Sequence, residues 1–164
     1  MKKYVAGAEL TEFLLAMSGL EPCRILDLGA GDGRTVGMLL EQGFFAQGID
    51  SCAGENVEAG DVLHCPYEDG SFDAVITEGV AYASGQEQEL LQEAKRVLKP
   101  GGMLLLADFC FTDTKGHVIM LENAGFQVNH VEDATAIWLD AGGLEEMEEW
   151  DRCRYFLSIC EKQA

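Results

Sequence analysis

Residues 24–43 combine a short apolar run with a glycine-rich turn and an amphipathic stretch. The run RILDL leads into GAGDG, in which glycine occupies alternate positions. Val36, Leu39 and Leu40 then follow at helical spacing, and the pattern stops at Gly43. A strand, a glycine loop and a helix in this order predict an α/β domain in which the loop lies beyond the carboxyl end of a parallel strand.

The rest of the chain alternates apolar strands with amphipathic helices. Further strands are predicted at FFAQGID, FDAVITE, MLLLADF, FQVNHVEDA and RYFLSICEK, and helices near residues 3–19, 84–98 and 115–124. Ser84 followed by Glu87 predicts a capping box at the start of the middle helix. Strands that are apolar throughout indicate a sheet covered on both faces. We therefore predict a Rossmann-like, doubly wound, mostly parallel sheet of six to seven strands with an antiparallel final strand.

Length and charge limit the classes of protein that fit this chain. Its 164 residues, without repeat or linker, predict one domain (1–164) with an N-terminal helix (1–20), a cofactor-binding core (24–110) and a candidate lid (136–152). The chain is acidic, with 29 Asp and Glu against 11 Lys and Arg and a net charge of −18. Such a chain repels phosphate, so we expect no nucleic-acid partner and no membrane partner.

The cysteines and the N-terminus indicate the cytoplasm. Glu9 and Glu12 interrupt the first residues, so no signal peptide is predicted, and no run is long enough to span a bilayer. The six cysteines include no CxxC pair, which favours reduced thiols over a disulfide framework. No metal site is predicted.

The glycine loop favours a nucleoside ligand other than a dinucleotide. Arg34 stands where the fingerprint G-x-G-x-x-G requires its third glycine. Asp27 and Asp32 add negative charge that a pyrophosphate would not favour and that ammonium or sulfonium groups would tolerate. Asp50 ends the next predicted strand, where a carboxylate can accept hydrogen bonds from ribose hydroxyls; the alternative is that it caps a helix.

Four stretches carry a family resemblance: ILDLGAGDG, GIDS, GDVLHCPYEDGSFDAVIT and LQEAKRVLKPGGMLLLAD. In this order, over about residues 24–108, the sequence resembles the class I S-adenosylmethionine-dependent methyltransferases, close to the small-molecule, ubiquinone/sterol methyltransferase-like (type 11) family. The resemblance implies S-adenosyl-L-methionine as cofactor, S-adenosyl-L-homocysteine as product and a small-molecule methyl acceptor.

The resemblance also implies which residues contact the cofactor. These would be Asp27, Gly29, Ala30, Gly31, Gly33, Asp50, Ser51, Asp61, Val62 and Glu78. Asp27 and the glycine loop would hold the methionine part and Asp50 the ribose. Asp61 and the Val62 main chain would contact the adenine, and Glu78 would lie beside the transferable methyl group.

The spacing departs from the family at one place. Only about ten residues separate Asp50 from Asp61, whereas a full parallel crossover takes at least about 10–12 residues and a further strand. We therefore predict that the helix usually found there is reduced to a turn or lost. The edge strand around residues 56–60 should be short.

Candidates for acid–base catalysis lie beside the predicted site. Glu78 and Tyr82 follow a central strand, where a base could take a proton from the acceptor. Alternatively Glu78 only binds cofactor and Tyr82 only forms a wall of the pocket. His64 and His117 are further candidates. No NPPY-type tetrapeptide follows the strand, so the chain does not resemble the base-amino methyltransferases.

Several alternatives stay open at this stage. Cys52, Cys65 and Cys110 follow predicted strands or site loops and could serve a soft acceptor such as trivalent arsenic, or simply pack. In the candidate lid, Leu144, Met147 and Trp150 share one helix side opposite glutamates 145, 146, 148 and 149; a solvated helix is equally consistent. The acceptor pocket could also be completed by a second subunit in a homodimer. A nucleotide-dependent oxidoreductase and a non-catalytic methyltransferase-like module acting in a complex are the other two classes.

Overall fold

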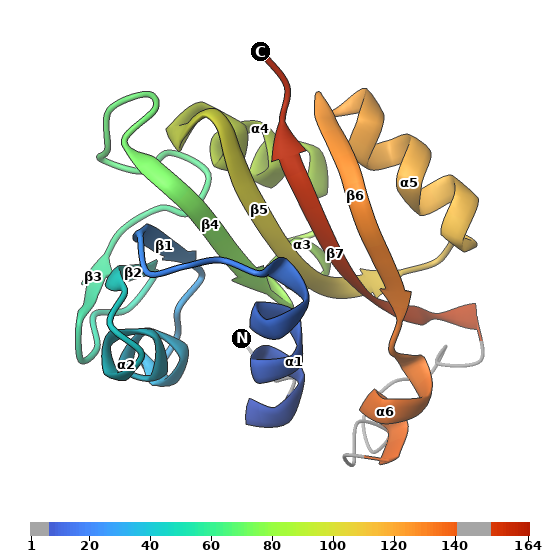
Figure 1. Cartoon of the computed structure of the whole chain (residues 1–164), viewed down its shortest axis with the longest axis horizontal. Coiled ribbons are helices and arrows are strands. Elements are labelled where there is room, and N and C mark those ends of the chain that lie inside the picture. The colour runs from blue at the N-terminus through green and yellow to red at the C-terminus, as the bar shows by residue number, and fades with distance from the viewer. Residues whose placement is uncertain (1–6, 141–151) are drawn as a thin grey trace.

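The computed structural model describes residues 7–140 and 152–164, and in this part of the chain seven strands form one sheet (Figure 1). The strands are β1 (Arg24–Leu28), β2 (Phe45–Asp50), β3 (Val57–Ala59), β4 (Phe72–Glu78), β5 (Leu98–Cys110), β6 (Phe126–Asp133) and β7 (Arg154–Lys162). Their order is β3-β2-β1-β4-β5-β7-β6, and β7 runs antiparallel to both β5 and β6, while the other neighbouring strands are parallel. The predicted fold class, including the antiparallel final strand, is confirmed.

Helices cover both faces of the sheet. They are α1 (Ala8–Ser18), α2 (Arg34–Glu41), α3 (Val80–Ser84), α4 (Glu87–Val97), α5 (Thr114–Asn123) and α6 (Thr135–Asp140). Successive strand residues alternate between two hydrophobic clusters, as Ile25 and Leu26 do, and both side chains are fully buried. The cluster that contains Ile25 includes residues of α1, α2 and α6, and the cluster that contains Leu26 includes residues of α3, α4 and α5.

The helix predicted near residues 84–98 begins later than its sequence pattern suggests. Ser84 is the last residue of α3, and its hydroxyl donates to the Ala81 carbonyl and accepts from the Gln86 N–H, both at 3.1 Å. Gly85 adopts a left-handed φ of 66° and separates α3 from α4, whose N-cap is Gln86. The predicted capping box is therefore wrong, because a turn stands between its two members.

The connection between β2 and β3 is short, as predicted. Residues 51–56 form turns rather than a helix, and β3 contains three residues. Gly54 and Val57 form an isolated bridge, and Asn56 reverses the chain with a φ of 58°. The Asn56 carbonyl then accepts a hydrogen bond of 3.1 Å from the Gly48 N–H of β2. This turn brings the chain back along β2 without a crossover helix.

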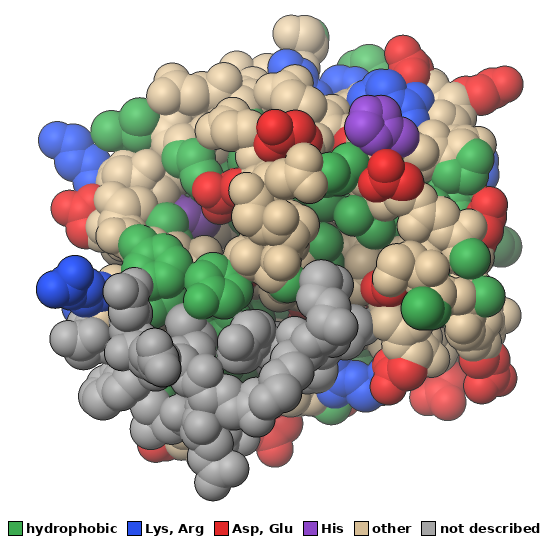
Figure 2. Space-filling view, turned by 180° about the vertical axis from the view of Figure 1, so that it is seen from behind, with side chains coloured by type: hydrophobic (Ala, Val, Ile, Leu, Met, Phe, Trp, Pro, Cys, Tyr) green, Lys and Arg blue, Asp and Glu red, His purple; other side chains and the backbone are tan. Residues whose placement is uncertain are grey.

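Two further observations bear on the sequence-based expectations. In the candidate lid, residues 136–140 belong to α6, and the stretch with Leu144, Met147 and Trp150 lies outside the described residues. No helix among residues 7–140 and 152–164 has the length and apolar character that crossing a bilayer requires. Figure 2 shows acidic side chains scattered among neutral ones over the back of the molecule.

Candidate functional site

A cavity of about 620 Å³ lies beyond the carboxyl ends of β1, β2 and β4. These strands are adjacent, and β1 lies where the direction of strand order reverses, which is the usual ligand position in an open α/β sheet. The cavity is lined by residues of the loops after β1, β2 and β3 and of the β4–α4 region: Gly29, Asp50, Ser51, Ala59, Gly60, Asp61, Val62, Leu63, Glu78, Gly79, Val80, Ala83, Ser84 and Gln86.

The glycine loop after β1 turns its backbone donors toward the protein. The N–H groups of Gly29 and Ala30 both donate to the Ile49 carbonyl, at 2.9 and 3.0 Å. The Gly31 N–H donates to Oδ2 of Asp50 at 2.9 Å. A loop that binds a pyrophosphate presents such N–H groups to the ligand, whereas here they are already bonded.

The same loop continues into α2 with further internal bonds. The Gly33 N–H donates to the Ala30 carbonyl at 3.0 Å, and the Arg34 N–H donates to Oδ1 of Asp32 at 3.1 Å. Gly33 has a φ of 84°, and a Cβ there would lie 2.3 Å from the Glu55 carbonyl oxygen. The turn that replaces the crossover helix therefore packs directly against the glycine loop.

Gly29 lets the loop after β1 approach α3. Its φ is 88°, and a Cβ at this position would lie 2.2 Å from Cγ2 of Val80. Asp27, two residues earlier, is buried on β1, with 3% of its surface exposed. Of the predicted loop contacts, Gly29 lines the cavity, whereas Asp27, Ala30, Gly31 and Gly33 are not among its lining residues.

Asp50 presents a carboxylate to the cavity with one donor on each oxygen. Gly31 donates to Oδ2, and the Ser51 hydroxyl donates to Oδ1 at 3.1 Å. A carboxylate has about four acceptor positions, so this arrangement can still accept hydrogen bonds from two ligand hydroxyls. The alternative that Asp50 caps a helix is wrong, since turns follow it.

Asp61 and Val62, which follow β3, form another part of the rim of the cavity. The Leu63 N–H donates to Oδ1 of Asp61 at 2.8 Å, and Nδ1 of His64 lies 3.1 Å from Oδ2. The bond from Leu63 and then that from His64 lower the pKa of Asp61. His64 is thus an exposed partner of Asp61 rather than a lining residue. The half-buried side chains of Val62 and Leu63 give this rim an apolar surface.

Two residues of α4 hold the loop that carries this rim. Oε1 of Glu93 accepts the Cys65 N–H at 2.6 Å, while Nη2 of Arg96 donates to the Cys65 carbonyl at 3.1 Å and to Glu93 at 2.7 Å. Burial alone would raise the pKa of Glu93, but the bonds from Arg96 and Cys65 outweigh it and the pKa lies below its usual value. Tyr67, in the same loop, donates to Glu58 at 3.1 Å.

The pair in α4 was missed in the sequence, although a signal was present. Glu93 falls on the predicted apolar face of its helix, beside Leu90, Ala94 and Val97, and is 6% exposed. A glutamate on such a face, three residues before an arginine, is typical of a buried ion pair that supports a neighbouring segment.

Glu78 accepts hydrogen bonds from two other elements at the wall of the cavity. The Thr11 hydroxyl of α1 donates to Oε2 at 2.7 Å, and the Thr35 hydroxyl of α2 donates to Oε1 at 3.1 Å. Thr11 and Thr35 carried no recognisable signal in the sequence, because their partner is 67 and 43 residues away.

Tyr82 does not line the cavity. Val80, Ala83 and Ser84 of α3 do so, while the Tyr82 ring lies 5.3 Å from that of Phe109 and 5.8 Å from that of Phe111. In the described part of the chain Tyr82 therefore belongs to an aromatic cluster beside the site rather than to the cavity wall.

Asp108 holds α3 through backbone hydrogen bonds, a role that the sequence did not predict. It is 2% exposed, and its carboxylate accepts N–H bonds from Ala81 at 2.8 Å, Tyr82 at 3.3 Å and Phe109 at 2.8 Å. Burial raises the pKa of Asp108 to about 7, against the effect of these three bonds. Asp108 is the one polar residue in the apolar run MLLLADF, and this pattern does not indicate that its side chain binds the backbone of α3.

His117 lies away from the cavity, in a second buried environment. Its Nε2 is 2.8 Å from the Ser158 hydroxyl, and its ring stacks on Phe156 at 4.6 Å. Burial lowers the pKa of His117 to about 4, so the imidazole is neutral near pH 7. This placement does not support the predicted role of His117 as a base.

The three cysteines considered for a soft acceptor lie in different surroundings. Cys52 is exposed, whereas Cys65 and Cys110 are buried, and burial raises the pKa of Cys65 to about 12 and also that of Cys110. A raised pKa disfavours the thiolate that binds soft metals. Within the described ranges, no group of three or more His, Cys, Asp or Glu side chains is arranged to hold a metal ion.

Comparison with known families agrees with this geometry. Residues 26–106 match the model of a family described as a methyltransferase domain. The match begins in β1, ends in β5 and includes the glycine loop, Asp50, the 61–69 loop and Glu78. These residues form a methyltransferase domain.

Two curated relatives of this methyltransferase domain show the extent of the similarity. The demethylmenaquinone methyltransferase of Beutenbergia cavernae is 37% identical over 98 residues, which are 52% of this chain and 40% of that protein. The arsenite methyltransferase of Aquipseudomonas alcaligenes is 29% identical over 121 residues, 58% of this chain and 35% of that protein. The chain thus spans less than half the length of these relatives.

A solved methyltransferase structure extends the comparison over nearly the whole fold. Phosphoethanolamine N-methyltransferase 2 of Haemonchus contortus, in complex with S-adenosyl-L-methionine, superimposes with a TM-score of 0.77 and 16% identity. The superposition covers 96% of this chain and 53% of that one. At this identity the likeness establishes the fold alone.

Proposed function

We propose that this protein is an S-adenosylmethionine-dependent methyltransferase that methylates a small-molecule acceptor. The observation that carries the proposal is the bond between the Gly31 N–H and Asp50, in a loop where the N–H groups of Gly29 and Ala30 also bond within the protein. A loop arranged in this way binds a nucleoside through carboxylate acceptors rather than a phosphate through backbone donors.

The residues at the cavity fit such a cofactor. Asp50 can accept from both ribose hydroxyls, and Val62 and Leu63 offer an apolar surface for a flat base. Asp50, Asp61 and Glu78 are the charged residues of the lining, and all are acidic. A ligand with cationic groups is therefore favoured over an anionic dinucleotide.

When bound, the cofactor supplies a methyl group on a sulfonium ion. A lone pair of the acceptor forms the new bond to the methyl carbon, and the electron pair of the C–S bond returns to sulfur. Any proton on the acceptor atom leaves to water or a base. The chain supplies mainly position and orientation. Gly79, which lines the cavity beside Glu78, adds no side chain to that wall, so that a ligand can lie against the backbone there.

Glu78 is better suited to binding than to base catalysis. Both of its oxygens already accept hydrogen bonds from hydroxyl groups of the protein, which fix the carboxylate in place. Tyr82 is the remaining predicted base, and its ring packs beside the site on Phe109. The acceptor class is supported by the names of the three related methyltransferases, which refer to arsenite, demethylmenaquinone and phosphoethanolamine.

Calorimetric titration with S-adenosylhomocysteine, with NADH as the control ligand, tests the cofactor. We expect saturable one-site binding of the first and none of the second. Transfer of a labelled methyl group from S-adenosylmethionine to a panel of amines, thiols, hydroxyl compounds and arsenite then tests the reaction. Cofactor binding without any product would instead support a non-catalytic module, and NADH binding would support an oxidoreductase.

A further inference from the structure

We propose that Thr11 and Thr35 are positioning residues that hold the Glu78 carboxylate toward the cationic, amino-acid end of the cofactor. The proposal rests on the proposed function, since it names how one wall of that site is set. It also makes the docking of α1 onto the sheet part of the binding site.

The first step is the convergence of three elements on one carboxylate. Glu78 ends β4, Thr11 lies in α1, and Thr35 lies in the first turn of α2, directly after the glycine loop. Figure 1 shows α1 and α2 on the same side of the sheet, and both contribute to one hydrophobic cluster. Each threonine donates to a different oxygen, so the two bonds together fix the orientation of the carboxylate.

The second step is the burial of both donors. Thr11 is 1% exposed and Thr35 is 6% exposed. A hydroxyl removed from water needs a partner, because an unmade hydrogen bond in the interior is destabilising. The Thr11 hydroxyl meets this need with a bond of 2.7 Å and the Thr35 hydroxyl with a bond of 3.1 Å, both to Glu78. Both hydroxyls are therefore directed at the Glu78 carboxylate because they need a hydrogen-bond partner away from water.

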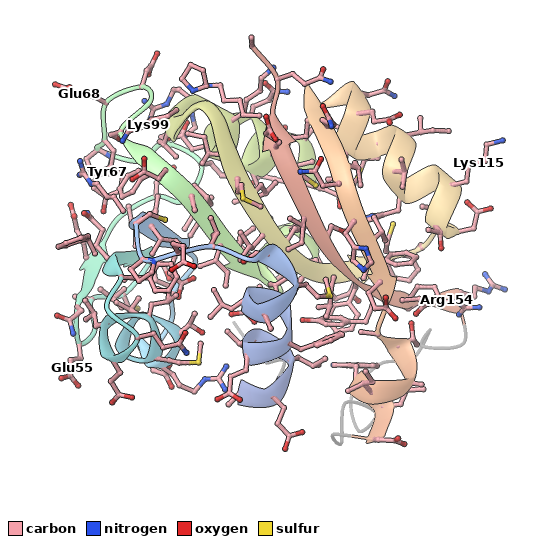
Figure 3. The ribbon with its side chains drawn as sticks, viewed as in Figure 1. Glu55, Tyr67, Glu68, Lys99, Lys115 and Arg154 are labelled. Carbon is pink, nitrogen blue, oxygen red and sulfur yellow. The ribbon has the colours of Figure 1, made fainter. Side chains whose placement is uncertain are left out.

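The third step is the distribution of charge around the cavity. Its lining contains no lysine or arginine within the described residues, and the basic side chains of Lys99, Lys115 and Arg154 project outward in Figure 3. Asp50 and Glu78 end strands on either side of β1, about 10 Å apart by strand spacing. One extended ligand can thus place its ribose at Asp50 and its ammonium group at Glu78.

The test compares two ligands that differ only at the amino-acid end. S-adenosylhomocysteine carries that end, and 5′-methylthioadenosine lacks it. For Thr11→Val and Thr35→Val we expect S-adenosylhomocysteine to bind ~10-fold more weakly, the effect of one lost bond to a charged group, with methylthioadenosine unchanged within about twofold. Thr11→Ser and Thr35→Ser, which keep the hydroxyl, should bind like the wild type.

A matched control lies one residue before Glu78. Thr77 is fully buried on β4, and its hydroxyl has no hydrogen-bond partner among the described residues. Thr77→Val removes a buried hydroxyl from the same strand and should leave the affinity for both ligands unchanged. Circular dichroism of each variant checks that it is folded before titration.

A double-mutant cycle separates positioning from general packing. In a Glu78→Gln background, Thr11→Val should cause no further loss of S-adenosylhomocysteine affinity. Equal weakening of both ligands, no weakening by either valine variant, full additivity in the cycle, or tighter binding by Glu78→Gln would each overturn the proposal. Failure of the proposed function looks different, because the wild type would then bind neither ligand.

Discussion

The carboxylate of Asp50 accepts the backbone N–H of Gly31 at 2.9 Å, so the end of β2 holds the glycine loop that follows β1. The bond joins residues 19 positions apart that become neighbours because β1 and β2 are parallel and adjacent. One oxygen therefore supports the loop, while the carboxylate as a whole faces the cavity.

Removing this carboxylate should weaken cofactor binding. For Asp50→Ala we expect an affinity for S-adenosylhomocysteine lower by at least ~1.5 kcal/mol, since bonds to a charged acceptor are worth about that much each. Asp113→Ala is the control: Asp113 caps α5 through the Gly116 N–H at 2.8 Å, far along the chain from the cavity lining. It should lose about 1 kcal/mol of stability and no affinity. Unchanged calorimetric affinity of Asp50→Ala would mean that the ribose lies elsewhere.

The close approach of the glycine loop to α3 predicts a specific sensitivity at Gly29. An alanine there would combine a left-handed φ of 88° with overlap on Val80. Gly85, with a φ of 66° and nothing near its Cβ position, isolates the backbone part of this effect. Gly85→Ala should lose roughly 1–2 kcal/mol in urea unfolding, and Gly29→Ala clearly more. Adding Val80→Ala should recover part of the difference; equal losses for the two glycines would contradict the packing described.

The ion pair of α4 predicts a link between that helix and the rim at Asp61. Glu93→Ala leaves the Cys65 N–H without its partner and removes one of the two carboxylates that Arg96 binds, while Asp69 remains. We expect a loss of roughly 2 kcal/mol in the free energy of unfolding. The Cys65 amide should exchange hydrogen faster. Glu89→Ala, on the exposed side of the same helix, should change stability by less than about 1 kcal/mol. Unaltered exchange at Cys65 in Glu93→Ala would show that the loop is held by other contacts.

Asp108 predicts a pH dependence of stability in an unusual direction. Because burial raises its pKa to about 7 in the folded protein, the folded state holds this proton more tightly than the unfolded chain does. Its contribution is complete below about pH 4 and is lost as the pH rises to about 7, by roughly 4 kcal/mol in total. Urea unfolding of Asp108→Asn between pH 4 and 8 should lack this decline. The same slope in wild type and variant would rule out Asp108 as its source.

His117 predicts the opposite dependence over nearly the same range. Its pKa is lowered to about 4 in the folded protein. The unfolded chain therefore binds a proton at His117 near pH 6.5, whereas the folded protein does so only near pH 4. Stability is lost as the pH falls from about 6.5 to 4, and His117→Gln should reduce that loss by up to roughly 3 kcal/mol. An acid slope in His117→Gln equal to that of the wild type would rule out His117 as its source.

Local sequence patterns predicted most of the fold. The strands other than β3 lie where their sequence patterns predicted them, and the spacing between Asp50 and Asp61 predicted the missing crossover helix. The predicted capping box is absent. Ser84 and Glu87 are residue types that form one, but Gly85 between them ends α3 before α4 begins. Residue type alone does not reveal such a turn, since a glycine also occurs within helices.

What the sequence determined by itself is the strand–loop–helix unit at residues 24–41 and the acidic residue that ends β2, because both depend on interactions between near neighbours. Only the tertiary structure decided which distant side chains surround the cavity. The bonds of Thr11 and Thr35 to Glu78, of Cys65 to Glu93 and of Ala81 to Asp108 span 67, 43, 28 and 27 residues. Each exists because the order of strands in the sheet brings separate segments to one edge, and hydrogen bonds act only at that short range.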